Sequence, residues 1–342
     1  MGWSRLRGWA WVAILGGAGV LSAQQLPPPE PPKPLPVPGG QGPTIRVTTQ
    51  EVLVPTLVEK KDGDVVYGLK PSDFIVEDNG VPQKIRVQEE LDTAPVSLVV
   101  AVEEGRSSAL EFDKLAKLGP LLDLFLSDPR SEAALVGFDS KPHLLHDYTH
   151  STEELGKNLK QLEPGDGGAA ILDTISYGLD LLEMEPKDNR RVLLLISEER
   201  DHGSKHTKPV GLIRKIGQSD VLVLSISYSP GKAEFLADLK SSNQGGAAAD
   251  LLAPLMMAIN GLKKNVSKEI ASMSGGEYDP FTRDKAFEAR VMEAAKHVRN
   301  RYLITFRPSN PTPGLHSLRV RTAEDYGARI VARANYWVDE AQ

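Results

Sequence analysis

Three separate segments of this 342-residue sequence combine carboxylates with small or hydroxyl side chains. Carboxylate and hydroxyl oxygens are the ligands that hard divalent cations prefer. Carboxylates also attract basic groups, and two of them about 5–10 Å apart in a cleft can act as general acid and base. We call this set the rim residues: Glu103, Glu104, Ser107, Asp166, Ala169, Glu198 and Glu199.

Continuous apolar runs precede two of these segments. Val96-Ser-Leu-Val-Val-Ala-Val leads to Glu103, and Arg191-Val-Leu-Leu-Leu-Ile-Ser leads to Glu198. Such runs are typical of strands covered on both faces in a parallel sheet, and helical patterns lie between them. The alternation predicts an α/β fold with a doubly wound, mostly parallel, Rossmann-like sheet. Ligands of such sheets sit at the carboxyl ends of the strands, so we expect the rim residues to meet there.

The chain ahead of this alternation changes composition twice. A basic start with Arg5 and Arg7, an uncharged apolar stretch and a Leu-Ser-Ala end are typical of a secretory signal peptide. A proline-rich segment then predicts an extended spacer, and β-branched runs with Asp-Gly and Asn-Gly turns predict hairpins. The predicted parts are a signal peptide (1–23), a linker (24–43), a β-rich section (44–92), an α/β domain (93–307) and a C-terminal β extension (308–342).

The signal peptide predicts an exported protein, periplasmic or extracellular, with an uncleaved N-terminal anchor as the alternative. Without Arg5 and Arg7 the chain keeps 38 basic against 46 acidic residues, a net charge of −8. We find no later segment that is apolar and long enough to span a membrane. The cysteine count of 0 excludes disulfides and thiolate sites, so the core must stabilise the fold unaided.

Several function classes lack their motifs here. Glu103-Glu-Gly-Arg-Ser-Ser, after the first apolar run, is not the Gly-x-Gly-x-x-Gly of a dinucleotide site, so we expect no nicotinamide or flavin cofactor. Without a Gly-x-Ser-x-Gly motif there is no visible serine nucleophile. A mildly acidic chain also has no electrostatic footprint for nucleic acid.

An insertion-like stretch at 229–264 ends in the apolar run Leu251-Leu-Ala-Pro-Leu-Met-Met-Ala-Ile. It is interpreted as a helix packed on the core. The alternative is an exposed, methionine-rich surface that adapts to a partner.

Motifs spread over most of the chain resemble the von Willebrand factor type A domain, in particular an exported bacterial group described as acidobacterial VWFA-related proteins. The resemblance runs from about Ile45 to Trp337. Its motifs are the segment 65–85, Ala134-Leu-Val-Gly-Phe-Asp, the Gly167-Gly helix start, the segment 193–199, Met273-Ser-Gly-Gly and Arg301-Tyr-Leu-Ile.

The resemblance implies a metal-ion-dependent adhesion site, built from Asp-x-Ser-x-Ser, a threonine and a further aspartate. In this sequence Glu103 and Gly105 stand at the first Asp and first Ser, and Ser107 at the second Ser. Ala169 stands at the threonine, and Glu198 at the last Asp. Each Glu extends its carboxylate by roughly 1.3 Å, more than the tight octahedron of Mg²⁺ tolerates. The resemblance therefore implies a degenerate site.

A remodelled site for Mg²⁺ or Ca²⁺ is the alternative, with Glu103, Ser107 and Glu198 as ligands. Glu104, Asp166 and Glu199 could then add carboxylates.

We therefore expect a module that binds a protein or a surface ligand through the rim residues, without a cofactor and without enzymatic activity. Two alternatives remain open: an acid/base hydrolase of an extracellular polymer, and a structural spacer domain. Without a metal, the acidic rim favours a cationic partner.

Overall fold

The described part of the chain contains one six-stranded sheet between helices and two four-stranded sheets. The computed structural model describes residues 51–88, 94–105, 112–228, 252–281 and 284–340. These residues belong to one compact unit, Val47–Gln342. The predicted signal peptide and linker lie outside the described residues, as do Ser107 and residues 229–251.

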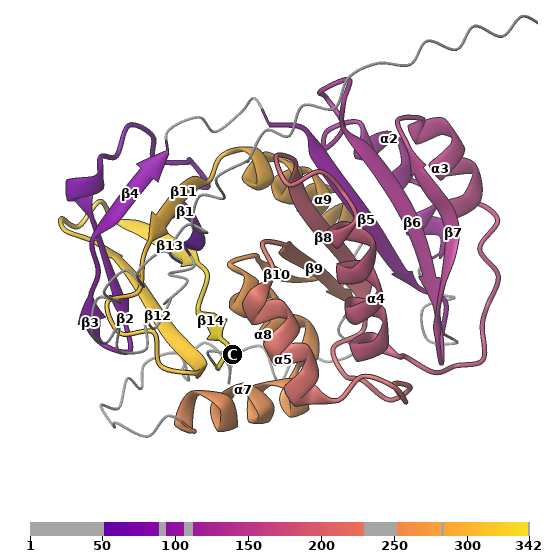
Figure 1. The fold of residues 1–342 in the computed structure, drawn as a ribbon. Coiled ribbons are helices and arrows are strands. Elements are labelled where there is room, and N and C mark those ends of the chain that lie inside the picture. Colours follow the sequence, from indigo (N-terminus) through magenta and orange to yellow (C-terminus); the bar gives the residue numbers. More distant parts are fainter. Residues whose placement is uncertain (1–50, 89–93, 106–111, 229–251, 282–283, 341–342) are drawn as a thin grey trace, which may run out of the picture. The chain divides into compact units, whose positions relative to one another are not determined.

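The six-stranded sheet has the order β10-β9-β8-β5-β6-β7 (Figure 1). Its neighbouring strands run parallel, except that β7 pairs antiparallel with β6 at the edge. Every residue of β5 is buried, as its unbroken apolar run predicts. The predicted mostly parallel sheet is confirmed. Its strands are β5 (Val96–Glu103), β6 (Glu132–Phe138), β7 (Pro142–Thr149), β8 (Arg190–Ser197), β9 (Leu222–Tyr228) and β10 (Tyr278–Phe281).

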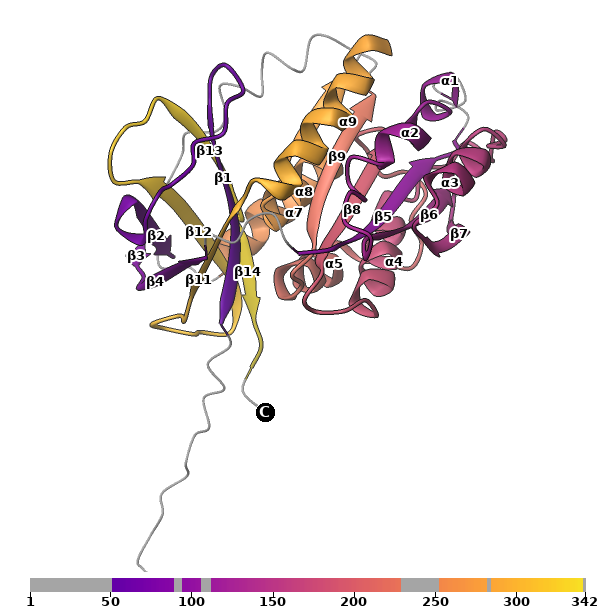
Figure 2. The ribbon, with the colours of Figure 1, turned by 90° about the horizontal axis from the view of Figure 1, so that it is seen from above.

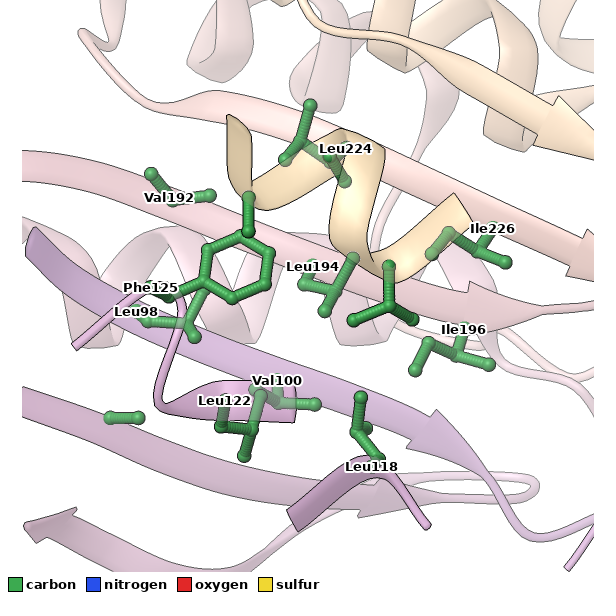
Figure 3. Close-up of a cluster of buried hydrophobic side chains, with 14 of the residues drawn as sticks. Leu98, Val100, Leu118, Leu122, Phe125, Val192, Leu194, Ile196, Leu224 and Ile226 are labelled. Carbon is green, nitrogen blue, oxygen red and sulfur yellow. The ribbon is translucent and has the colours of Figure 1, made fainter. Parts of the chain in front are cut away.

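Helices cover both faces of this sheet, with one apolar core on each side (Figures 1 and 2). Successive side chains of β5 point to opposite faces, so Leu98 and Val100 belong to the core on one side, together with Leu118 and Phe125 (Figure 3). Val99 and Ala101 pack on the other side. The first face carries α1 (Phe112–Leu115), α2 (Leu118–Leu122), α3 (Thr152–Leu159) and α9 (Asp284–Arg299). The second carries α4 (Ile171–Glu183), α5 (Pro209–Gln218), α7 (Ala253–Lys264) and α8 (Val266–Ser274).

The Met273-Ser-Gly-Gly motif ends α8 and turns the chain into β10. Asn265 caps the start of this helix by accepting a hydrogen bond from the Lys268 backbone N–H at 2.8 Å. Gly275 ends it with a left-handed φ of 86°, which glycine adopts without a side-chain clash. A Cβ on Gly276 would lie 1.8 Å from the Val223 carbonyl oxygen, so this position also requires glycine.

The two four-stranded sheets have the orders β13-β1-β11-β4 and β14-β12-β2-β3. They share one apolar core, which includes Val54, Phe74 and Ile304. The first sheet contains β1 (Val52–Lys60), β4 (Ile85–Gln88), β11 (Tyr302–Phe306) and β13 (Ala328–Ala332). The second contains β2 (Phe74–Asp78), β3 (Val81–Pro82), β12 (Gly314–Thr322) and β14 (Asn335–Val338), and the 3₁₀ turn η1 (Pro71–Asp73) precedes β2.

Strand β11 does not continue the doubly wound sheet, although the sequence alternation placed it there. It lies antiparallel between β1 and β4. Burial alternates along β11, which is typical of a strand with one covered face. The periodicity of a sequence predicts such a strand but does not predict which sheet it joins. The N-terminal β-rich section and the C-terminal strands thus share sheets.

The buried guanidinium of Arg333 connects these strands to the helical layer. It is 5% exposed and donates to the Leu53 carbonyl oxygen on β1 at 3.2 Å. It also donates to the carbonyl oxygens of Ile216 (3.2 Å) and Gly217 (2.6 Å) at the end of α5. Burial lowers the pKa of Arg333 to about 10, so the group stays charged at neutral pH. One side chain thereby satisfies carbonyl groups of two layers.

Helix α7 combines both properties considered for the end of the 229–264 stretch. Ala258 and Leu262 are buried in the core of the second face. Met256 and Met257 are 55% and 67% exposed on the same helix. Within the described residues, no helix is both long and apolar enough to cross a membrane.

A buried polar cluster joins β2, β12 and β14. His316 Nδ1 donates to Asp78 Oδ1 at 2.8 Å, and its Nε2 donates to the Thr312 carbonyl oxygen at 2.7 Å. Tyr336 donates to the other Asp78 oxygen at 2.7 Å. Because each ring nitrogen lies within hydrogen-bond distance of an acceptor oxygen, these contacts favour the doubly protonated imidazole. Burial lowers the pKa of His316, but the Asp78 carboxylate and the Thr312 carbonyl outweigh burial and raise it.

This raised pKa predicts a stability that depends on pH. The contribution of His316 is complete below about 6.5, the unfolded pKa, and is lost as pH rises through the higher folded value. Urea unfolding of a His316→Gln variant should show about 1–3 kcal/mol less stability at pH 6 and a smaller loss towards pH 9 than the wild type. His150→Gln, an exposed control, should leave both unchanged. Equal pH dependence in wild type and His316→Gln would contradict this assignment.

Candidate rim site

The carboxyl ends of β5 and β8 lie side by side, because the two strands pair in parallel. Strand order reverses between them: the chain passes from β5 to β6 on one side and from β8 to β9 on the other. Glu103 is the last residue of β5, and Glu198 directly follows β8. This is the switch point at which doubly wound sheets bind ligands.

Glu103 is buried in this position, with 1% of its surface exposed. Its Oε2 accepts a hydrogen bond from the Glu198 backbone N–H at 2.8 Å, which ties the two strand ends together. Burial raises the pKa of Glu103 to about 7, against hydrogen bonds from Glu198 and the Tyr228 side chain that lower it. The negative charge of Glu198 adds to the increase, and His202 opposes it.

Glu104 extends the buried carboxylates towards β6. Its backbone N–H donates to the Phe138 carbonyl oxygen at 2.7 Å, and its carbonyl oxygen accepts from the Gly165 N–H at 2.7 Å. A Cβ on Gly137 would lie 2.6 Å from Glu104 Oε2, so the carboxylate occupies the space that the glycine leaves. Burial raises the pKa of Glu104 to about 7, and the charge of Asp139 adds to it.

A histidine contacts a glutamate at two points of the rim. His143 Nε2 lies 3.3 Å from Glu104 Oε2. His202 Nε2 pairs with Glu198 Oε1. The two imidazoles are 45% and 49% exposed, whereas the carboxylates beneath them are 9% and 21% exposed. Each histidine thus lies between a carboxylate and solvent.

Asp166 stabilises the loop that leads into α4 by accepting backbone hydrogen bonds. Its Oδ1 accepts from the backbone N–H groups of Gly168 (2.9 Å) and Ser140 (3.2 Å). These hydrogen bonds hold the pKa of Asp166 below its usual value, and the one from Gly168 has the largest effect. Gly167 has a φ of 90°, and a Cβ on Gly168 would lie 2.3 Å from Ser140 Oγ, so both glycines are required by the loop.

Ala169 is fully buried at the start of α4, and its methyl group offers no ligand atom. The first N–H groups of α4 are satisfied from the loop after β8. Leu172 donates to Asp201 Oδ1 at 3.0 Å, and Asp173 donates to Ser204 Oγ at 2.9 Å. The helix start is therefore capped by side chains of the chain itself.

The predicted rim residues do not all converge. Glu103 and Glu198 are joined directly, and the close approach of Gly105 to the Gly168 carbonyl brings the first two loops together. Glu199 instead accepts a hydrogen bond from the Tyr278 hydroxyl at 2.5 Å. Ser107 lies outside the described residues.

Sequence reasoning missed four contributors to this edge: Asp139, His143, Asp201 and His202. Asp139 Oδ2 accepts from the Asp166 N–H, and Asp201 caps α4. The histidine at 202 lies four residues after Glu198, but that spacing indicates a contact only in a helix, and this segment is a loop. Residues that reach the rim from other strands and turns, such as Asp139 and His143, have no sequence pattern near the rim residues that would predict the contact.

No protein-family model and no curated protein matches the chain. Among solved structures it is similar to the conserved hypothetical protein BatB from Bacteroides thetaiotaomicron, with 14% identity and a TM-score of 0.41 over 59% of this chain and 98% of that one. It is also similar to the vWF domain of the type V pili tip protein Mfa5 from Porphyromonas gingivalis, with 11% identity and a TM-score of 0.44 over 60% and 95%. A third similar structure is proximal thread matrix protein 1 from the mussel byssus, with 13% identity and a TM-score of 0.43 over 64% of this chain and 49% of that one. At these identities and TM-scores, the similarity supports no conclusion about the function of this chain.

The pKa of Glu103 predicts how stability changes with pH. Since the folded pKa of about 7 exceeds the ordinary glutamate value of 4.5, the folded state holds the proton more tightly. Stability should therefore fall by about 3 kcal/mol as pH rises from about 4.5 to about 7. Denaturant unfolding of Glu103→Gln should lack this part of the decrease.

The exposed Glu183→Gln variant is the control and should retain the decrease in full. If Glu103→Gln and wild type lose the same free energy over this pH range, Glu103 is already ionised below it and the account of the buried carboxylate is wrong.

Proposed function

We propose that the chain is an exported binding module of the von Willebrand factor type A kind, in which Glu104 and Glu198 of the rim bind a basic group of a partner protein without a dication. The observation that carries this proposal is the direct hydrogen bond between Glu198 and the buried Glu103 at the switch point. The resemblance to the type A domain implies a metal ion at these two positions, which supports the proposal that the hydrogen bond replaces it.

The chemistry of the side chains supports the loss of that metal site. Mg²⁺ needs about six oxygen ligands in a compact octahedron. Here Glu103 is buried and accepts from Glu198, while Ala169 supplies a methyl group where the resemblance implies a hydroxyl. Asp166 accepts backbone hydrogen bonds, and Glu199 accepts from Tyr278. Glu198 Oε1 pairs with His202, and within the described residues these carboxylates do not bring three ligand atoms within 4.8 Å of one another, so they fit the ion poorly.

The electrostatics of the rim favour a basic partner. The charge of Glu198 raises the pKa of Glu103, and that of Asp139 raises the pKa of Glu104, so neighbouring carboxylates repel each other. The partly exposed imidazoles of His143 and His202 contact Glu104 and Glu198 from the solvent side. A lysine or arginine of a partner can replace these contacts and offset the surplus negative charge.

Burial argues for binding instead of hydrolysis. A general acid must reach the bond that it protonates. Glu103 has the raised pKa of such an acid but is 1% exposed, and its hydrogen bonds go to Glu198 and Tyr228. We therefore propose a non-enzymatic role. The signal peptide and linker predicted from the sequence support export and presentation of the module on a spacer.

The test is capture of partners from the native envelope fraction on the immobilised protein. Partners should remain bound in a chelator and dissociate in high salt, because salt screens the attraction between the acidic rim and a basic partner and leaves metal coordination intact. Glu104→Gln combined with Glu198→Gln should weaken capture about tenfold, or roughly 1.4 kcal/mol.

Asp188→Asn is the matched control. Asp188 is exposed in the turn before β8, at the opposite end of the sheet, and its change should leave capture unaffected. Release of the partner by chelator, or equal loss with Asp188→Asn, would contradict the proposal.

A further inference from the structure

A second cluster of ligand-type side chains lies where α9 faces β1. Glu59 comes from β1, and Glu293 and His297 come from α9. One ligand atom of each residue lies within 4.8 Å of the others. On a helix, residues four apart share a face, so Glu293 and His297 reach the same point. We call these three residues the β1–α9 cluster.

The orientation of His297 is fixed by a carboxylate on its far side. His297 Nδ1 lies 2.9 Å from Glu277 Oε2, and Arg301 donates to the same oxygen at 2.9 Å. Both oxygens of Glu277 accept hydrogen bonds from guanidinium groups, Oε2 from Arg301 and Oε1 from Arg329 at 3.2 Å. Because this carboxylate acts as an acceptor, the Nδ1 proton of His297 points to Glu277. A ligand histidine is commonly oriented by such a carboxylate.

The other ring nitrogen points into the cluster. His297 is 1% exposed, and Nε2 is buried without a hydrogen-bond partner among the described residues. It lies 3.2 Å from Glu59 Oε1, while Glu59 Oε2 accepts from Arg329 at 2.8 Å. With the proton on Nδ1, a lone pair on Nε2 faces a carboxylate oxygen. This arrangement requires a positive species between the two atoms.

We infer that the β1–α9 cluster binds a first-row divalent metal ion such as Zn²⁺ or Mn²⁺ through His297 Nε2 and the carboxylates of Glu59 and Glu293. One imidazole nitrogen with two carboxylate groups suits these ions better than Mg²⁺, which prefers oxygen alone. The Glu293 carboxylate is 33% exposed and leaves a side open to solvent for entry of the ion and for water ligands.

The ion would connect the two parts of the unit. Glu59 belongs to the sheet of β1 and β13, whereas α9 covers the six-stranded sheet. The cluster shares no residue with the rim, so it does not depend on the proposed function.

The alternative positive species is a proton. Arg290, Arg301 and Arg329 already contact carboxylates around the cluster. A second proton on His297 would then complete two ion pairs, to Glu277 and to Glu59, without any metal. Metal binding and double protonation exclude each other at Nε2, which makes the inference testable.

The experiment is calorimetric titration of the metal-free full chain with Zn²⁺, with bound metal measured after dialysis. We expect one equivalent per chain, and binding at least tenfold weaker in His297→Gln and in Glu293→Gln. Glu293 is partly exposed, so its variant retains the fold even if the buried His297→Gln variant does not; circular dichroism checks both. His150→Gln, at an exposed histidine outside both the rim and this cluster, is the control and should bind as the wild type does.

Two results would overturn the inference. One is the absence of a Zn²⁺ site in the wild type, or a site that Glu293→Gln leaves unchanged. The other is a nitrogen-15 spectrum in which His297 keeps protons on both ring nitrogens in the presence of excess Zn²⁺. If rim variants lose partner capture but still bind Zn²⁺, that result concerns the proposed function of the rim and leaves the metal-binding inference standing.

Discussion

Burial of β5 on both faces is the constraint on which the site depends. All eight residues of this strand are buried, and the last of them is Glu103. A carboxylate carried into such an environment loses hydration, which raises the pKa of Glu103 to about 7. The surrounding chain compensates with a backbone donor from Glu198. The strand that forms the centre of the sheet thus also determines the protonation chemistry at its end.

The same burial explains why glycines surround the carboxylates. Gly137 makes room for Glu104, and Gly105 lies where a Cβ would be 2.9 Å from Glu103 Oε1. Gly168 approaches Ser140 in the neighbouring loop. The carboxylates of Glu103 and Glu104 and the glycines of the neighbouring loops therefore pack closely at this end of the sheet.

Sequence patterns predicted what depends on local order, and missed what depends on distant pairing. The apolar runs of β5 and β8 predicted both strands, and the switch-point rule placed Glu103 and Glu198 together. The contact of His143 with Glu104 follows from the antiparallel turn of β7 back along β6, which periodicity does not encode. For the same reason β11 was predicted as a strand but placed in the wrong sheet. Asp201 had no helix-start pattern of its own, because it caps α4 from another loop.

The central claim is that the rim works through carboxylates and basic groups without a dication. Calorimetric titration with Mg²⁺ at neutral pH, on the wild type and on Glu198→Ala, tests it most directly, because Mg²⁺ is the ion that the type A resemblance implies. The account predicts no heat that depends on Glu198. Micromolar Mg²⁺ binding in the wild type that disappears in Glu198→Ala would show a working metal site and contradict the account.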